Sequence, residues 1–221
     1  MHNHPQTNLF RRHCLLSSLS GALLLATGCS RSAQPTTQTL ARDATLLCLG
    51  DSLTFGFGAA AGASYPARLE QLSGHVTQNA GVNGDTAEGA LARLPGLLQA
   101  NTPGLVLVSI GGNDFLRRLP LERTRAALIE LVKTAQGRAQ VVLIAQPEPT
   151  PMAAAMGALK DHPVYAEVAG DTGAPLFEGG WSYVLSRAEL RSDQIHANAQ
   201  GYGVFAERLA DWLQGKKLVA G

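Results

Sequence analysis

The sequence predicts an α/β fold whose central sheet is mainly parallel. Three runs, at 44–49, 105–110 and 141–145, are almost entirely apolar, as expected of strands that are buried on both faces. Segments with helical spacing alternate with these runs, and this alternation is typical of a parallel sheet covered by helices on both sides. At 221 residues the chain fits one domain with a sizeable core.

The remaining elements are weaker or helical. Two short runs, at 75–79 and 175–177, complete a sheet of about five strands. Helices are expected at 65–72, 85–100, 121–136 and 198–213. Asp85 or Thr86 can cap the second helix, and Pro95 should bend or interrupt it. The stretch 146–180 is rich in Pro, Gly and Ala, and loops of this length often cover a substrate.

Four short polar motifs lie between these predicted elements, at 50–53, 79–84, 111–114 and 193–196. The first three come at or just after the ends of apparent strands. Because parallel strands open their ligand crevice at their carboxyl ends, these motifs should meet at one edge of the sheet. This convergence carries the functional interpretation, since each motif alone has an ordinary structural explanation.

The motifs supply the parts of a nucleophilic hydrolase. Ser52 is the candidate nucleophile, and His196 is the candidate base. Asp193 stands three residues before His196, so in a helical turn both side chains share one face and the carboxylate can fix the imidazole tautomer. Two other histidines, His75 and His162, are weaker candidates for the base. His75 has no carboxylate nearby, and the acid beside His162 is its direct neighbour in the chain, so the two side chains point in different directions.

Three hydrogen-bond donors can form an oxyanion hole. They are the backbone N–H groups of Ser52 and Gly84 and the side-chain amide of Asn113. The ordinary alternatives are a helix-capping serine, a turn glycine and a turn asparagine. Asp51 is expected to orient the loop, because adjacent residues point in different directions.

A metal site is the second interpretation of the same edge. Of its candidate ligands, only Asp193 and His196 have a spacing that is familiar from metal sites. A metal would also leave Ser52 and Asn113 without roles. We therefore do not favour a metal site. A phosphate-binding loop is disfavoured because its lysine is missing. The candidate metal ligands are Asp51, Asp85, Asp114, Asp193 and His196.

The N-terminal segment has the pattern of an export signal. Arg11 and Arg12 precede an apolar stretch at 14–26, which is shorter than the ~20 residues of a membrane span. An uncleaved anchor helix and a twin-arginine signal are the alternatives. Residues 25–29 resemble a bacterial lipobox, which implies a signal peptide at 1–28 and a lipid on Cys29. A flexible tether at 29–42 then leads to the hydrolase domain at 43–216.

Lipidation at Cys29 implies attachment to a membrane facing the periplasm. Ser30 follows, with no Asp to retain the protein at the inner membrane, so the outer membrane is favoured. The formal net charge of +1 gives no indication of a nucleic-acid partner. Cys48 lies in an apolar run and is expected to be a core residue.

Taken together, the motifs resemble the SGNH hydrolases, also called GDSL lipases/esterases. The likeness covers roughly 44–213, and residues 84–86 and 92–95 are most similar to periplasmic arylesterases, thioesterases and lysophospholipases. The resemblance implies a flavodoxin-like three-layer α/β/α fold and ester hydrolysis without a cofactor. Ala197, where the family often has Pro, and the segment 146–191 depart from the pattern.

The sequence therefore predicts a serine esterase that hydrolyses a small acyl ester through an acyl-enzyme. One alternative is a carbohydrate O-deacetylase of the cell envelope that uses the same residues. Another is an inactive lipoprotein that uses the fold for binding, because a fold alone does not determine function. The motifs specify neither the acyl chain nor the oligomeric state.

Overall fold

The structure, a computed structural model, describes residues 38–150, 152–153 and 156–219. All of these belong to the unit Gln34–Gly221, which is separate from the unit Met1–Ala33. The predicted signal peptide at 1–28, Cys29 and most of the tether lie outside the described residues. No helix within the described ranges is long and apolar enough to cross a membrane.

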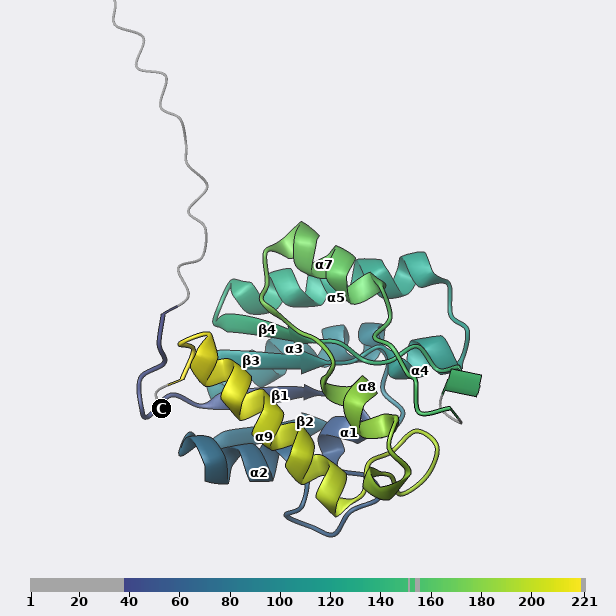
Figure 1. Ribbon diagram of the computed structural model, residues 1–221. Helices are drawn as coiled ribbons and strands as arrows, with labels where there is room; N and C mark the ends of the chain where they lie inside the picture. The colour runs from purple at the N-terminus through teal and green to yellow at the C-terminus, as the bar shows by residue number, and fades with distance from the viewer. Residues whose placement is uncertain (1–37, 151, 154–155, 220–221) are drawn as a thin grey trace, which may run out of the picture. The chain divides into compact units, whose positions relative to one another are not determined.

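A five-stranded parallel sheet forms the centre of the fold (Figure 1). Its strand order, β2-β1-β3-β4-β5, is that of flavodoxin-like proteins, so the predicted fold class is confirmed. The strands are β1 (Leu46–Gly50), β2 (Thr77–Gly81), β3 (Leu105–Ser109), β4 (Gln140–Ile144) and β5 (Leu176–Phe177).

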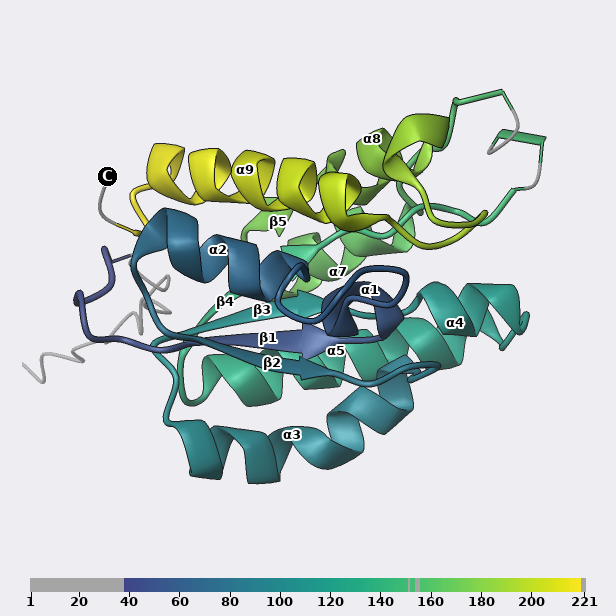
Figure 2. The ribbon, with the colours of Figure 1, turned by 90° about the horizontal axis from the view of Figure 1, so that it is seen from below.

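Helices cover both faces of the sheet (Figure 2). One face carries α2 (Tyr65–Ser73), α8 (Gly180–Leu185) and α9 (Ala199–Gly215), and the other carries α3 (Ala87–Asn101), α5 (Leu121–Gln136) and α7 (Val164–Thr172). Three short helices, α1 (Ser52–Phe55), α4 (Gly112–Leu116) and the 3₁₀ helix η1 (Ala188–Leu190), belong to connections.

The alternation of side chains along β1 explains the two layers. Leu46 and Cys48 join the core beneath α2, α8 and α9, whereas Leu47 and Leu49 join the core beneath α3 and α5. All four side chains are fully buried, which confirms Cys48 as a core residue. A strand that is apolar at every position thus contributes side chains to the cores on both faces of the sheet.

The structure corrects the predicted elements in two places. The second strand begins at Thr77 rather than at His75, which is buried with its Nδ1 3.1 Å from the carbonyl oxygen of Ala44. This strand lies at the edge of the sheet and is largely polar, so no apolar pattern marks its ends. Helix α3 begins at Ala87 rather than at Asp85 and continues through Pro95, so the interruption offered as one alternative is wrong, whereas Thr86 caps the helix as predicted.

The segment 146–180, for which only a short strand was predicted, also contains a helix. Helix α7 lies within it, and Pro147 and Asp161 form an isolated antiparallel bridge. This bridge closes a loop that leaves the end of β4 and returns to the same edge of the sheet.

Arg93, on helix α3, forms hydrogen bonds to the ends of two strands. Its guanidinium donates to the carbonyl oxygens of Gly50 (2.9 Å) and Ala80 (2.7 Å), at the ends of β1 and β2, and to the carboxylate of Asp85 (2.8 Å). Because hydrogen bonds to a charged group are stronger than neutral ones, this residue holds the edge where Ser52 begins α1.

Arg93→Ala is expected to lower the free energy of unfolding by about 2 kcal/mol, since it removes three charge-assisted hydrogen bonds in a half-buried site. Urea titration followed by circular dichroism measures the change. The control is Arg138→Ala, an exposed arginine on the same layer, which should change stability by less than ~0.5 kcal/mol. Equal losses in the two variants would contradict this role for Arg93.

Candidate active site

The end of β1 leads directly into the candidate nucleophile. Asp51 is the N-cap of α1, and its Oδ1 accepts a hydrogen bond from the backbone N–H of Leu53 at 3.0 Å. The alternative in which Ser52 caps the helix is therefore wrong, and the expectation that Asp51 orients the loop is confirmed. A Cβ on Gly50 would lie 2.4 Å from the carbonyl oxygen of Ser109, so only glycine allows β1 and β3 to end so close together.

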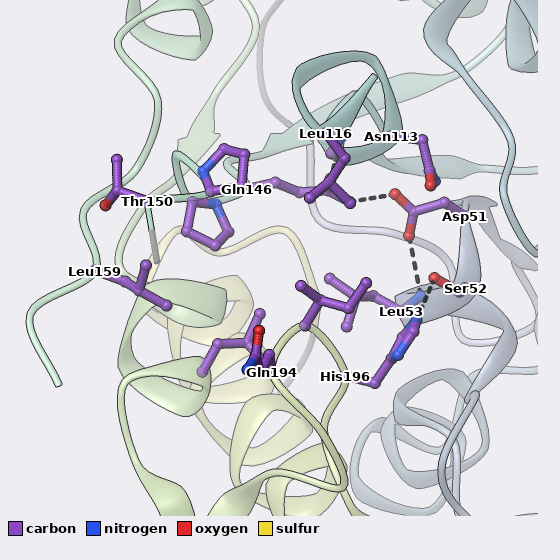
Figure 3. Close-up of a pocket in the computed structure, with 15 residues that line it drawn as sticks. Asp51, Ser52, Leu53, Asn113, Leu116, Gln146, Thr150, Leu159, Gln194 and His196 are labelled. Atoms are coloured by element: carbon purple, nitrogen blue, oxygen red, sulfur yellow. Dashed lines mark hydrogen bonds between the residues drawn. The ribbon is translucent and has the colours of Figure 1, made fainter. Parts of the chain in front are cut away.

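Ser52, His196 and Asp193 form a hydrogen-bonded chain (Figure 3 shows its Ser52–His196 link). The Oγ of Ser52 lies 3.0 Å from Nε2 of His196, and Nδ1 of His196 lies 2.7 Å from Oδ2 of Asp193. The three residues that the sequence picked out are thus brought together from two ends of the domain. The ring of Phe57 covers the imidazole, with centroids 4.5 Å apart.

The predicted helical turn between Asp193 and His196 is wrong. Residues 192–195 form a bend, in which Oδ1 of Asp193 accepts from the backbone N–H groups of Ile195 and His196, both at 2.8 Å. One carboxylate oxygen therefore shapes the loop while the other holds the imidazole. Partial burial raises the pKa of Asp193, but the hydrogen bonds from His196 and from the two backbone N–H groups outweigh it and lower the pKa overall.

The candidate oxyanion donors lie at the same edge. Asn113, on α4, lines one pocket with Ser52 and His196, and its Nδ2 donates to the carbonyl oxygen of Asp85 at 2.9 Å. This bond uses one amide hydrogen and fixes the plane of the side chain, which leaves the second hydrogen available. Gly84 does not line the pocket itself but precedes Asp85 in the adjoining turn, where its φ of 75° suits glycine.

The pocket has a polar end and an apolar wall. The polar end carries the strand-edge groups, and the wall is built from residues that follow β1, β3, β4 and β5 (Figure 3). Such a division suits a ligand whose reactive group is polar and whose remainder is apolar. The apolar side chains of the wall are Leu53, Leu116, Pro147, Pro149, Leu159, Leu185 and Ile195.

Gln146 is the residue that sequence reasoning missed. It follows β4, is 1% exposed, and donates through Nε2 to Oδ2 of Asp51 at 2.9 Å. Its Oε1 accepts from the backbone N–H of Gly112 at 2.6 Å, so one side chain connects the Ser52 turn with the Asn113 turn. The available signal was its position, since it is the first polar residue after an apolar run, as Asp51 is.

Burial has a clear electrostatic effect on Asp51. It raises the pKa of this carboxyl to about 6, although the hydrogen bonds from Gln146 and from the N–H of Leu53 oppose the rise. A carboxyl group this close to His196 therefore has a smaller negative charge near neutral pH than an exposed aspartate has.

The alternative residues at this edge have other partners. Asp85 pairs with Arg93, and Asp114 accepts from the N–H of Ala87 at 3.0 Å and from the hydroxyl of Thr124 at 3.2 Å. Two of the five candidate metal ligands therefore stabilise the fold. His162 stacks on the ring of Phe115, with centroids 4.1 Å apart.

Comparisons with known proteins agree with the fold and the motifs. The family model described as "GDSL-like Lipase/Acylhydrolase family" matches residues 48–204. The thioesterase 1/protease 1/lysophospholipase L1 of Escherichia coli (strain K12) is 33% identical over 180 residues, which cover 77% of this chain and 83% of the relative. The arylesterase of Vibrio mimicus is 29% identical, with 76% and 87% covered.

A solved structure of similar fold is that of the psychrotrophic esterase EstA from Pseudoalteromonas sp., with a TM-score of 0.69 and 27% identity. The match covers 79% of this chain and 98% of that one. The predicted resemblance to the SGNH hydrolases is confirmed by these matches. The chain belongs to the GDSL-like lipase/acylhydrolase family and is a serine hydrolase that acts on ester bonds.

Proposed function

We propose that Ser52 is the nucleophile of this esterase, with His196 as its base and Asp193 as the group that holds the base. The observation that carries the proposal is the continuous chain of hydrogen bonds from Ser52 Oγ through the imidazole to the Asp193 carboxylate. His196 removes the hydroxyl proton as Oγ attacks the ester carbonyl, and Asp193 stabilises the imidazolium that forms.

The reaction then completes through an acyl-enzyme. The tetrahedral intermediate collapses, the alcohol leaves with the proton from His196, and the acyl group remains on Ser52. Water enters, His196 takes its proton, and a second tetrahedral intermediate releases the carboxylic acid and restores the hydroxyl. The N–H groups of Ser52 and Gly84 and the amide of Asn113 donate to the oxyanion in both halves of the reaction.

The substrate class follows from the apolar wall of the pocket. An acyl chain packs against the leucine and proline side chains there, while the ester carbonyl reaches the polar end. This wall favours acyl esters over an acetylated sugar, which presents hydroxyl groups along its length. It agrees with the arylesterase and lysophospholipase names of the relatives.

Export and lipid attachment complete the proposal. The sequence pattern at 1–28 supports cleavage before Cys29 and attachment of a lipid to its sulfur, which anchors the domain to a membrane facing the periplasm, the outer membrane in preference to the inner. Intact mass spectrometry of the purified membrane fraction tests it. A mature chain that begins at Cys29 and carries the added mass of acyl groups is expected, and an unmodified N-terminus would overturn it.

Ser52→Ala is expected to abolish turnover of short p-nitrophenyl esters, since no other group replaces the attacking oxygen. Circular dichroism should show an unchanged fold, because the hydroxyl belongs to no structural cap. Ser73→Ala, a serine at the end of α2, is the matched control and should keep its activity. Undiminished turnover in the Ser52 variant would reject this serine as the nucleophile.

Asn113→Ala is expected to lower kcat by roughly 10²–10³, because the donor acts on charge that develops near the transition state. The KM for a short ester should change far less than kcat. Steady-state kinetics over a substrate series separate the two constants. An effect confined to KM would mean that Asn113 binds the ground state instead.

A further inference from the structure

Most of the exposed large apolar side chains in the described residues lie in segments at the carboxyl end of the sheet, and two of them, Leu116 and Ile195, line the pocket. All but Leu72 and Val76 lie in connections that follow the carboxyl ends of the strands, or beside His196. We define the rim as the seven of these that follow β1, β2 or β3 or lie beside His196: Phe55, Phe57, Val82, Leu116, Leu119, Leu121 and Ile195. A clustered exposed apolar surface of this kind marks an interaction site.

Contacts link the neighbouring connections that carry the rim. The carbonyl oxygen of Phe55 accepts from the side chain of Asn79 on β2, the strand that leads to Val82. The carbonyl oxygen of Gly84 then accepts from Arg117 at 2.7 Å, next to Leu116. On the other side, Leu116 and Ile195 both line the pocket, and Phe57 lies against His196.

Both ribbon views place the connections of the rim at one end of the sheet (Figures 1 and 2). Helices α1 and α4 lie there, beyond the arrowheads of β1 and β3. The pocket adjoins the rim, because two rim residues, Leu116 and Ile195, belong to the lining of the pocket. Anything that covers the rim therefore faces the candidate nucleophile.

The rim also carries positive charge. Arg117 and Arg118 lie between Leu116 and Leu119, and residues 116–123 are all exposed. Among the described residues neither arginine forms an ion pair, whereas Arg123 is paired with Glu88. Glu122 is the acid within this stretch. Aromatic and aliphatic side chains beside unpaired arginines match the interface of an anionic lipid bilayer.

We propose that the rim docks on an anionic lipid surface, from which the acyl ester enters the pocket. This inference rests on the proposed function, since it takes the pocket as the acyl site. A second copy of the chain seated on the rim would cover the mouth of the pocket and exclude the substrate. A lipid surface instead supplies the substrate at the mouth, and it pairs phosphate groups with Arg117 and Arg118.

Vesicle sedimentation tests the proposal on the chain from Ser30 onward, which contains every described helix and strand and both core clusters and lacks the lipidation site. Ser52→Ala is present in every binding sample, so that no lipid is hydrolysed. Vesicles contain phosphatidylcholine, either alone or with phosphatidylglycerol. We expect binding to the anionic vesicles at low salt, with weaker binding at high salt because the charges are screened.

Two variants test separately how the apolar side chains and the positive charge of the rim contribute to vesicle binding. Phe55→Ser with Leu119→Ser removes two rim side chains that do not line the pocket, and Arg118→Gln removes one charge. Each is expected to lower the vesicle partition coefficient, by roughly tenfold or more for the apolar pair and roughly fivefold for the arginine. The matched control, Leu72→Ser with Val76→Ser, alters equally exposed apolar residues near the start of β2 and should bind like the parent.

Activity on a water-soluble short ester, measured with Ser52 restored, keeps the two proposals distinguishable. Normal activity in the rim variants together with lost vesicle binding supports docking. Normal activity with no vesicle binding by the parent, or with equal binding by rim and control variants, overturns docking alone. Loss of dimerisation rather than of vesicle binding in the rim variants would assign the rim to a second copy. Absence of esterase activity from the parent would overturn the proposed function itself.

Discussion

The site depends on one buried carboxylate at the end of β1. Asp51 is 2% exposed, and it caps α1 with one oxygen while it accepts from Gln146 with the other. A charged group in such a place is stable only when its oxygens are hydrogen-bonded, so these contacts determine how the chain turns after Gly50. Ser52 is the next residue, and the direction of its side chain follows from that turn.

The same carboxylate connects the turn of the proposed nucleophile to the turn of a proposed oxyanion donor. Gln146 bridges from Asp51 to the N–H of Gly112, so the turn that carries Asn113 is held in register with the turn that carries Ser52. Trp181, which is fully buried, donates from Nε1 to the hydroxyl of Ser109, the second acceptor of Gln146. The polar network therefore reaches into the aromatic core beneath α9, which connects the proposed site to that core.

The proposed base and the carboxylate that holds it come from a different part of the chain. His196 and Asp193 lie in a loop that has no helix or strand of its own, and the loop is shaped by the Asp193 side chain bonding to its own backbone. The ends of the strands therefore carry the proposed nucleophile and the proposed donors, while a loop that bonds to its own backbone carries the proposed base. The same histidine would serve as base in both half-reactions, so the hydrogen bonds that hold this loop keep the imidazole beside Ser52.

The sequence was most informative where burial dictates the pattern. The apolar runs of β1, β3 and β4 located the centre of the sheet, and the rule that parallel strands open at their carboxyl ends placed Ser52, Gly84 and Asn113 at one edge, where Ser52 and Asn113 line the same pocket as His196. The limits of β2 were missed because an edge strand needs no apolar alternation. Gln146 was missed because nothing in a glutamine within a proline-rich stretch indicates that its side chain is buried. The helical turn assumed for Asp193 and His196 failed because a three-residue spacing is equally suited to an aspartate-capped bend.

The central claim is that His196 activates the hydroxyl of Ser52 within this pocket. Its most direct test is covalent labelling with a fluorophosphonate probe, followed by mass spectrometry of the modified peptide. The label is expected on Ser52, and its rate of attachment should fall by several orders of magnitude in His196→Ala, since the unactivated hydroxyl is a poor nucleophile. A label on another residue, or an unchanged rate without the imidazole, would contradict the account.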